Sequence, residues 1–170
     1  AMVSRSGRRR HLGLGGLADA TTRPRSATLP AMEERCRREI EELHRFFVQW
    51  FTAAEQGSDQ GFARVASALA DDFQMISPRG VRDDRASILG AIRRAHGGRA
   101  DEPFSIAVED MCVRLLQPPL CIVTYEEHQR AGESSSARLS TAVFRERRDA
   151  PEGVEWVHLH ETWLPDGAPK

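Results

Sequence analysis

The sequence predicts an α+β domain in which three helices come first and a largely antiparallel sheet follows. Apolar residues recur every three or four positions in the first part of the chain and every second position from residue 104 onward. Turns and loops rich in Pro, Gly and Ser separate the later segments, as in a meander of strands. Because each element has one apolar face, we expect the helices to pack on one face of the sheet.

Two amphipathic helices open the predicted domain. The first covers residues 32–56 and ends at Gly57, and either Ser58 or Asp59 caps the second. The apolar stripe of the first helix consists of Ile40, Leu43, Phe47, Trp50 and Ala54. The second helix closes at Asp71–Asp72.

A short strand and a third helix come next. The strand is predicted over residues 73–76 and turns at Ser77–Gly80. Asp83 or Asp84 caps the third helix, which stops at Gly97.

Period-2 alternation predicts four longer strands with a bulge near Glu109 in the first. They are expected over residues 104–117, 120–130, 138–148 and 154–164.

The amino-acid composition indicates the cellular compartment and limits the kinds of partner that are expected. Residues 1–31, which are rich in arginine, are expected to form a disordered basic arm, residues 32–166 the domain and residues 167–170 a flexible tail. The rest of the chain is mildly acidic, which argues against nucleic acid as a partner. No apolar run approaches the ~18 residues of a membrane span, and three scattered cysteines favour a reducing, cytoplasmic location.

The last strand carries the most informative residue. Side chains on a strand alternate between two faces. Val157, Leu159, Glu161 and Trp163 form the more apolar face and are expected in the core, with Trp156, His158, His160 and Thr162 opposite. Glu161 is therefore predicted to be a buried carboxylate, which needs a partner or a place in a pocket.

The order of elements resembles the NTF2-like superfamily. Residues 70–80 are similar to its SnoaL-like and DUF4440-type branches, and residues 156–163 are similar to its final strand. Residues 121–123 and 141–144 resemble strands of the calcium/calmodulin-dependent kinase association domain. The resemblance implies a cone of three helices packed on a curved sheet, a homodimer joined through the exposed sheet face, and a pocket between sheet and helices.

The resemblance also bears on the ligand. Inward arginines line the pocket of the kinase association domain, and the positions that match them here are Glu126, Ala142 and Glu161. This replacement favours a small neutral or cationic apolar ligand over an anion.

Paired carboxylates are the leading candidates for chemistry. If Thr124, Glu126 and His128 share the pocket face, Glu126 can approach Glu161, and such a pair supplies a general acid and base. In that reading His128 or Tyr125 stabilises an oxyanion. The alternative is that the two carboxylates form salt bridges with arginines such as Arg114 or Arg138.

The remaining pocket wall is predicted to be apolar, although core packing explains most of these residues equally well. The predicted ligand-contacting residues are Phe47, Trp50, Phe51, Phe73, Thr124, Ala142, Phe144, Leu159 and Trp163. His158 and His160 lack further ligands at metal-site spacing, so they are assigned to the subunit interface and no metal or cofactor is predicted.

Three functions are consistent with these patterns. The first is a homodimeric protein that binds a small molecule. The second is a cofactor-independent lyase, isomerase or cyclase that uses Glu161 or Glu126 as a base. The third is an assembly module without catalysis.

Overall fold

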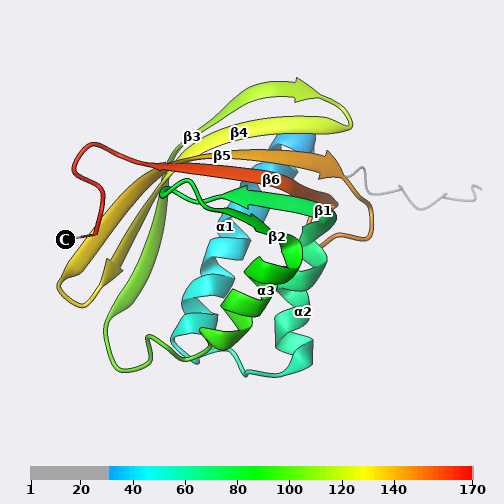
Figure 1. Cartoon of the computed structure of the whole chain (residues 1–170). Coiled ribbons are helices and arrows are strands. Elements are labelled where there is room, and N and C mark those ends of the chain that lie inside the picture. Colours follow the sequence, from blue (N-terminus) through cyan, green and yellow to red (C-terminus); the bar gives the residue numbers. More distant parts are fainter. Residues whose placement is uncertain (1–30, 170) are drawn as a thin grey trace, which may run out of the picture.

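The computed structural model describes residues 31–169. The predicted basic arm, apart from its final residue, and Lys170 lie outside the described residues. Three helices pack on one face of a curved six-stranded sheet, so the predicted α+β cone is confirmed (Figure 1).

The helices are α1 (Met32–Phe51), α2 (Asp59–Ala68) and α3 (Arg85–Arg94). The hydroxyl of Ser58 accepts a hydrogen bond from the N–H of Gly61 and caps α2. The carboxylate of Asp84 accepts from the N–H of Ser87 and caps α3. In each case the structure selects one of the two predicted caps.

Helix α1 ends five residues earlier than predicted. The backbone N–H of Gly97 donates to the carbonyl of Trp50, and that of Arg99 donates to the carbonyl of Phe51. The chain after α3 thereby satisfies carbonyls at the end of α1. Ala53, with φ of 59°, then turns the chain away from the helix axis.

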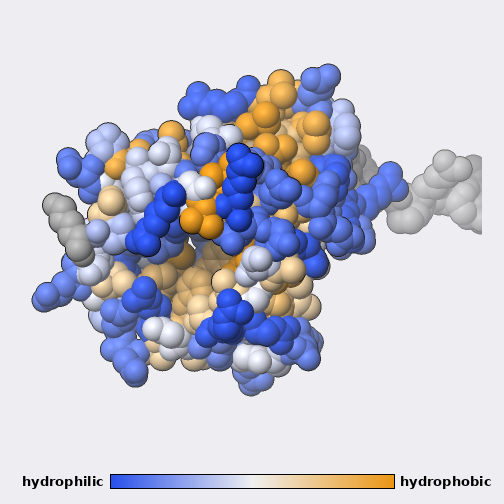
Figure 2. All heavy atoms as spheres, viewed as in Figure 1, coloured by the Kyte–Doolittle hydropathy of each residue, from blue (hydrophilic) through white to orange (hydrophobic). Residues whose placement is uncertain are grey.

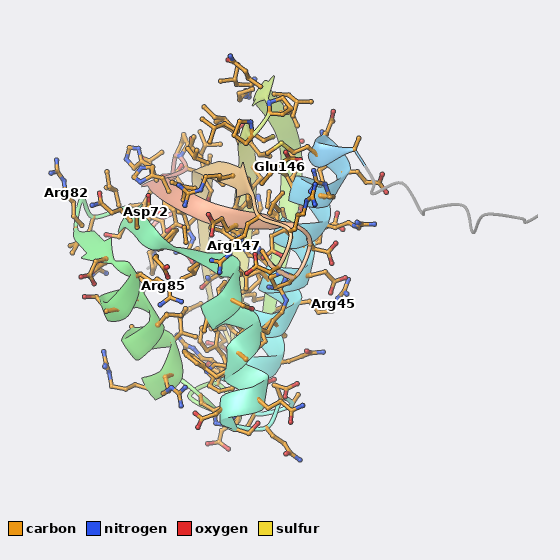
Figure 3. All side chains as sticks on the ribbon, turned by 90° about the vertical axis from the view of Figure 1, so that its right-hand side faces the viewer. Arg45, Asp72, Arg82, Arg85, Glu146 and Arg147 are labelled. Carbon is orange, nitrogen blue, oxygen red and sulfur yellow. The ribbon has the colours of Figure 1, made fainter. Side chains whose placement is uncertain are left out.

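Arg85 joins the start of α3 to the end of α2. Its guanidinium donates to the carbonyls of Ala66 and Leu69 at 2.7 and 3.2 Å. Figure 3 shows Arg85 between the two helices. A cation at the carboxyl end of a helix is favourable because the carbonyl dipoles point toward it.

The sheet has the strand order β2-β1-β6-β5-β4-β3. All neighbours are antiparallel except β1 and β6, which run parallel. The strands are β1 (Leu69–Ile76), β2 (Arg82–Asp84), β3 (Phe104–Gln117), β4 (Leu120–Ala131), β5 (Ser134–Glu146) and β6 (Val154–Trp163). Strand β2 was not predicted, and β1 begins four residues earlier than expected.

Bulges decide which side chains face the helices. The predicted bulge in β3 lies between Glu109 and Cys112, where Asp110 has φ of 49°. Another irregularity, between β5 and β6, leaves Val157 without a direct partner, since Phe144 pairs with Trp156 and Val143 with His158. Trp156 is consequently buried in the core, whereas strict alternation placed it on the opposite face.

The carboxyl-terminal segment is held at Gly167, inside the predicted tail. Gly167 is buried, and its carbonyl accepts a hydrogen bond from the N–H of Ala137 at 2.7 Å. The ordered contacts of the domain therefore reach one residue past the predicted boundary at Asp166.

Candidate functional site

A cavity of about 220 Å³ lies between the inner face of the sheet and the three helices. Figure 2 shows a hollow there, with hydrophobic atoms on its floor. The wall is apolar along most of its extent. Its apolar residues are Leu43, Phe47, Phe51, Val65, Leu69, Phe73, Met75, Ile88, Ala91, Ile92, Ile106, Trp156 and Leu159.

Polar side chains gather at the part of the wall formed by α1, β4, β5 and β6. They are His44, Tyr125, Glu127, Gln129, Arg138 and Glu161. Strand pairing explains the grouping, because Tyr125 pairs with Ser140 and Ser140 pairs with Glu161. Residues paired across neighbouring strands point to the same face, so these three form one row across the sheet.

Glu127 and Arg138 form the next row and are also paired across β4 and β5. The guanidinium of Arg138 donates to both buried carboxylates, through Nη2 to Oε1 of Glu127 and through Nη1 to Oε2 of Glu161 at 3.3 Å. One arginine therefore joins the two rows.

His44 completes the cluster from α1. Its Nδ1 lies 2.6 Å from the carbonyl oxygen of Ile40, and its Nε2 lies 3.1 Å from Oε2 of Glu127. A carbonyl and an ionised carboxylate can only accept, so both ring nitrogens must donate and the ring is an imidazolium. Burial by itself lowers the pKa of His44, but the hydrogen bond and charge of Glu127 outweigh it and raise the pKa.

The pKa values of the two carboxylates are displaced in opposite directions. Burial raises the pKa of Glu127, but His44 and Arg138 together hold it well below its usual range. Glu161 is 3% exposed. Burial, with a smaller contribution from the charge of Glu127, raises its pKa to about 7 although Arg138 opposes the shift. Glu127 is thus an anion at neutral pH, and Glu161 exchanges a proton there.

Two hydroxyls in this cluster are buried without a partner. Among the described residues, neither Oη of Tyr125 nor Oγ of Ser140 makes a hydrogen bond of good geometry, although the Ser140 hydroxyl is near enough to Tyr125 and Glu161 to lower the pKa of each. Burial, reinforced by the charges of Glu127 and Glu161, raises the pKa of Tyr125, so its hydroxyl keeps its proton. A buried polar group without a partner is costly, and one that lines a cavity can be satisfied by a ligand that enters it.

The predicted pairing of Glu126 with Glu161 is wrong. On β4 the buried residues are Cys121, Val123, Tyr125 and Glu127. Glu126 and His128 lie on the opposite face, where Nε2 of His128 is 3.1 Å from Oε2 of Glu126. The register differs by one residue from the expected one, and such a slip moves every side chain of a strand to the other face.

The same slip moves Thr124 out of the predicted pocket wall. Its hydroxyl accepts a hydrogen bond from Nε of Arg114 at 2.8 Å on the outer face. Tyr125, which the expected alternation places on the opposite face from Glu126, is instead a cavity residue.

The other predicted wall residues divide into two groups. Phe47, Phe51, Phe73 and Leu159 line the cavity. Trp50, Ala142 and Phe144 are buried in the surrounding core, and Trp163 is half-buried outside the wall.

Sequence reasoning missed His44 as a site residue and considered Arg138 only as a salt-bridge partner. His44 lies four residues after Ile40 and three before Phe47, on the apolar stripe of α1. A polar residue on such a stripe was the available signal.

Two further features of the described residues bear on the site. They contain no group of three or more His, Cys, Asp or Glu residues arranged to hold a metal ion. No helix within residues 31–169 is long and apolar enough to cross a membrane.

A three-helix cone with a cavity against a curved sheet is the NTF2-like fold, as the sequence resemblance predicted. An NTF2-like protein of unknown function from Pseudomonas aeruginosa superimposes with a TM-score of 0.69 and 24% identity, covering 77% of this chain and 99% of that one. A CaMKII hub from S. rosetta superimposes with a TM-score of 0.60 and 15% identity, covering 81% and 100%.

Residues 36–165 match the family described as sucrose-6-phosphate phosphohydrolase C-terminal, and the chain belongs to that family. Sucrose-phosphatase 1 of Nicotiana tabacum is 21% identical over 131 residues, which cover 76% of this chain and 31% of the relative. Probable sucrose-phosphatase 2 of Arabidopsis thaliana is 18% identical over 125 residues, covering 74% and 29%. The chain thus spans about a third of the length of these relatives.

Proposed function

We propose that this chain binds a small, uncharged, mainly apolar molecule in the cavity between sheet and helices, with its one polar group directed at Tyr125 and Glu161. The observation that carries the proposal is the contrast between a long apolar wall and a single cluster of buried polar groups. Such a combination is typical of sites for small organic ligands, which use few polar contacts to fix orientation.

Charge balance favours an uncharged ligand. His44 and Arg138 supply two buried cations; Glu127 contacts both of them, and Glu161 contacts Arg138. A cationic ligand would meet these cations, and the guanidinium of Arg138 is already engaged by two carboxylates. The names of the relatives make sugar phosphates a ligand class to test, but the apolar wall and the engaged arginine favour a neutral molecule.

Ligand binding can be tested by following backbone amide signals in NMR titrations with ethylbenzene, acetophenone, sucrose and sucrose 6-phosphate. We expect the two aromatic probes to shift signals of cavity residues and the two sugars to leave them unchanged. An engineered apolar cavity of about 150 Å³ already accommodates benzene, so the probes are of suitable size.

A blocked cavity supplies the control for this titration. Ala91 is exposed on α3 yet lines the cavity, which places it at the opening. Ala91→Trp should abolish the shifts, whereas Ala86→Trp, on an exposed part of the same helix outside the wall, should preserve them. Equal binding to both variants would contradict the proposed location.

Catalysis is the second candidate, because a carboxyl group with a pKa of about 7 in an apolar cavity can exchange protons with a carbon acid. In this reading Glu161 is the base and Tyr125 donates to the developing oxyanion. Exchange of the methyl hydrogens of acetophenone for deuterium can be followed by NMR. Glu161→Gln should abolish the exchange and preserve binding, and equal exchange rates in the two proteins would exclude this role.

We further propose a homodimer joined through the outer face of the sheet. Ile122, Val143 and Leu139 give this face apolar area, and Leu139 is 38% exposed. The similarity in fold to a CaMKII hub is consistent with self-association. Leu139→Glu should halve the mass measured by light scattering. If neither aromatic probe binds the natural protein or the Leu139→Glu variant, an assembly module without a ligand becomes the favoured function.

The three free cysteines support the expected reducing, cytoplasmic compartment.

A further inference from the structure

Resting on the proposed function, we infer that the ligand's polar group is an uncharged carbonyl oxygen, as in a ketone, ester or amide, which accepts hydrogen bonds from Tyr125 and from a protonated Glu161. Tyr125, Ser140 and Glu161 form one row across three adjacent strands. All three residues are at most 3% exposed. Because Tyr125 and Glu161 both line the cavity, a group held between them remains within the apolar enclosure.

Tyr125 supplies the first donor. Its hydroxyl is buried and has no partner among the described residues. Since burial keeps the phenol protonated, it offers an O–H to whatever group approaches it. A ligand that brings only a donor would leave this proton unsatisfied.

Glu161 supplies the second donor, and the geometry indicates which oxygen bears the proton. Oε2 faces Nη1 of Arg138, which can only donate, so Oε2 is an acceptor in both protonation states. When the carboxyl group is protonated, the hydrogen is therefore on Oε1. Two donors in one row converge most readily on one acceptor with two lone pairs, and a carbonyl oxygen is such an acceptor.

The charges around Glu161 favour the same ligand group. His44 faces it from α1, Glu127 and Tyr125 from β4, and Arg138 from β5. The cavity residues of α2, α3, β1 and β3 are apolar. With Glu161 protonated, the imidazolium, the guanidinium and the Glu127 carboxylate leave one net positive charge, which attracts the negative end of a carbonyl dipole.

Other ligand groups satisfy this cluster less completely. An amine adds a further cation to the site. A hydroxyl can accept from Tyr125, but it pairs best with an ionised Glu161 to which it can donate. A hydrocarbon leaves the buried hydroxyl of Tyr125 unsatisfied. The three classes therefore differ in how their binding depends on pH.

Three probes with the same carbon skeleton represent the carbonyl, hydroxyl and hydrocarbon classes: acetophenone, 1-phenylethanol and ethylbenzene. Their dissociation constants are to be measured by NMR titration at pH 5.5 and pH 8.5, on either side of the pKa of Glu161. At pH 5.5 we expect acetophenone to bind about tenfold more tightly than ethylbenzene, as one or two net hydrogen bonds imply. At pH 8.5 the ratio of the ethylbenzene dissociation constant to that of acetophenone should fall several-fold, since Glu161 no longer has a proton to donate.

Two variants make the test specific. Tyr125→Phe should weaken acetophenone binding several-fold without weakening ethylbenzene binding, so the dissociation constant of ethylbenzene also reports that the cavity is intact. Glu161→Gln retains an N–H donor at every pH, and the acetophenone constant should then be the same at both pH values. The second variant tests the inference even if the first does not fold.

The outcomes distinguish failure of small-molecule binding from failure of the carbonyl assignment. If none of the three probes binds, the proposed function fails and the inference with it. If ethylbenzene binds as tightly as acetophenone at pH 5.5, if 1-phenylethanol binds most tightly, or if the ratio does not change with pH, the cavity binds small molecules but the carbonyl assignment is overturned.

Discussion

Glu127 and Glu161 bind the same guanidinium, that of Arg138, yet the pKa of one is lowered and that of the other is raised. The difference lies in the other neighbours. Glu127 also accepts from His44 at 3.1 Å and from Gln129 at 2.6 Å. Glu161 has the 3.3 Å contact with Arg138, and the charge of His44 and the hydroxyl of Ser140 also lower its pKa, but together they do not outweigh its burial. Two carboxyl groups whose pKa values are shifted in opposite directions can serve different roles, one as a fixed charge and one as a proton donor or acceptor.

Glu161→Gln should stabilise the protein at high pH. The folded pKa of about 7 lies above the ordinary value of 4.5, so the stability linked to this proton is complete below pH 4.5 and is lost as pH rises through 7. The variant should gain on the order of 1–3 kcal/mol over the natural protein at pH 8 and little near pH 4.5. Urea unfolding at both pH values measures the difference.

Glu126→Gln is the matched control for this experiment, because Glu126 lies on the outer face and is only half-buried. Its effect should be small at both pH values. A Glu161→Gln protein that is less stable than the natural protein at pH 8 would show that the ionised carboxylate stabilises the fold through Arg138.

His44→Ala should destabilise the domain strongly, since it removes a buried partner of Glu127. Breaking a buried ion pair by deleting one member costs about 3–5 kcal/mol. Because the pKa of His44 is raised, its contribution is complete below pH 6.5 and is lost as pH rises through the raised value. Thermal and urea unfolding at pH 6 are the suitable measurements.

His128→Ala provides the comparison for His44→Ala. His128 is paired with Glu126 on the outer face and is partly exposed. A loss below about 1 kcal/mol is expected for such a pair. Equal losses in the two variants would contradict the assignment of His44 to the buried cluster.

The thiols should differ in reactivity. Cys36 and Cys121 are fully buried, and burial, together with the proximity of Cys121, raises the pKa of Cys36. Cys112 is only partly buried. A chromogenic disulfide reagent should therefore modify one thiol per native chain rapidly and three after denaturation. Rapid reaction of three thiols in the native protein would contradict the burial of Cys36 and Cys121.

The proposed dimer should weaken in acid if the outer sheet face forms the interface. His158 and His160 both lie on that face, beside Val143 and Thr141 of β5. Acid favours the charged form of histidine, and like charges repel across a shared surface. Size-exclusion chromatography at pH 5 and pH 8 measures the effect, and equal elution of the dimer at both values would remove this hypothesis.

A double variant links that result to the two histidines. His158→Gln with His160→Gln should elute identically at both pH values while remaining dimeric at pH 8. If acid still dissociates the double variant, other groups are responsible.

The sequence by itself determined the α+β class, the pair of neighbouring residues that contains the cap of α2 and of α3, and the burial of Glu161. These features depend on local spacing, since a cap acts within three residues and Glu161 stands between Leu159 and Trp163 on one apolar face. The bounds of β3 were predicted for the same reason, because turn-forming and polar residues flank a continuous alternating run.

Only the tertiary structure decided the end of α1, the register of β4 and the composition of the polar cluster. Alternating residues on β4 fit either face, because Glu126 and Glu127 are both carboxylates and exchange places with a shift of one residue. His44, Arg138 and Glu161 come from three elements far apart in the chain. Their proximity and shifted pKa values depend on which faces pack together, and that packing is settled by contacts between distant segments that no local pattern encodes.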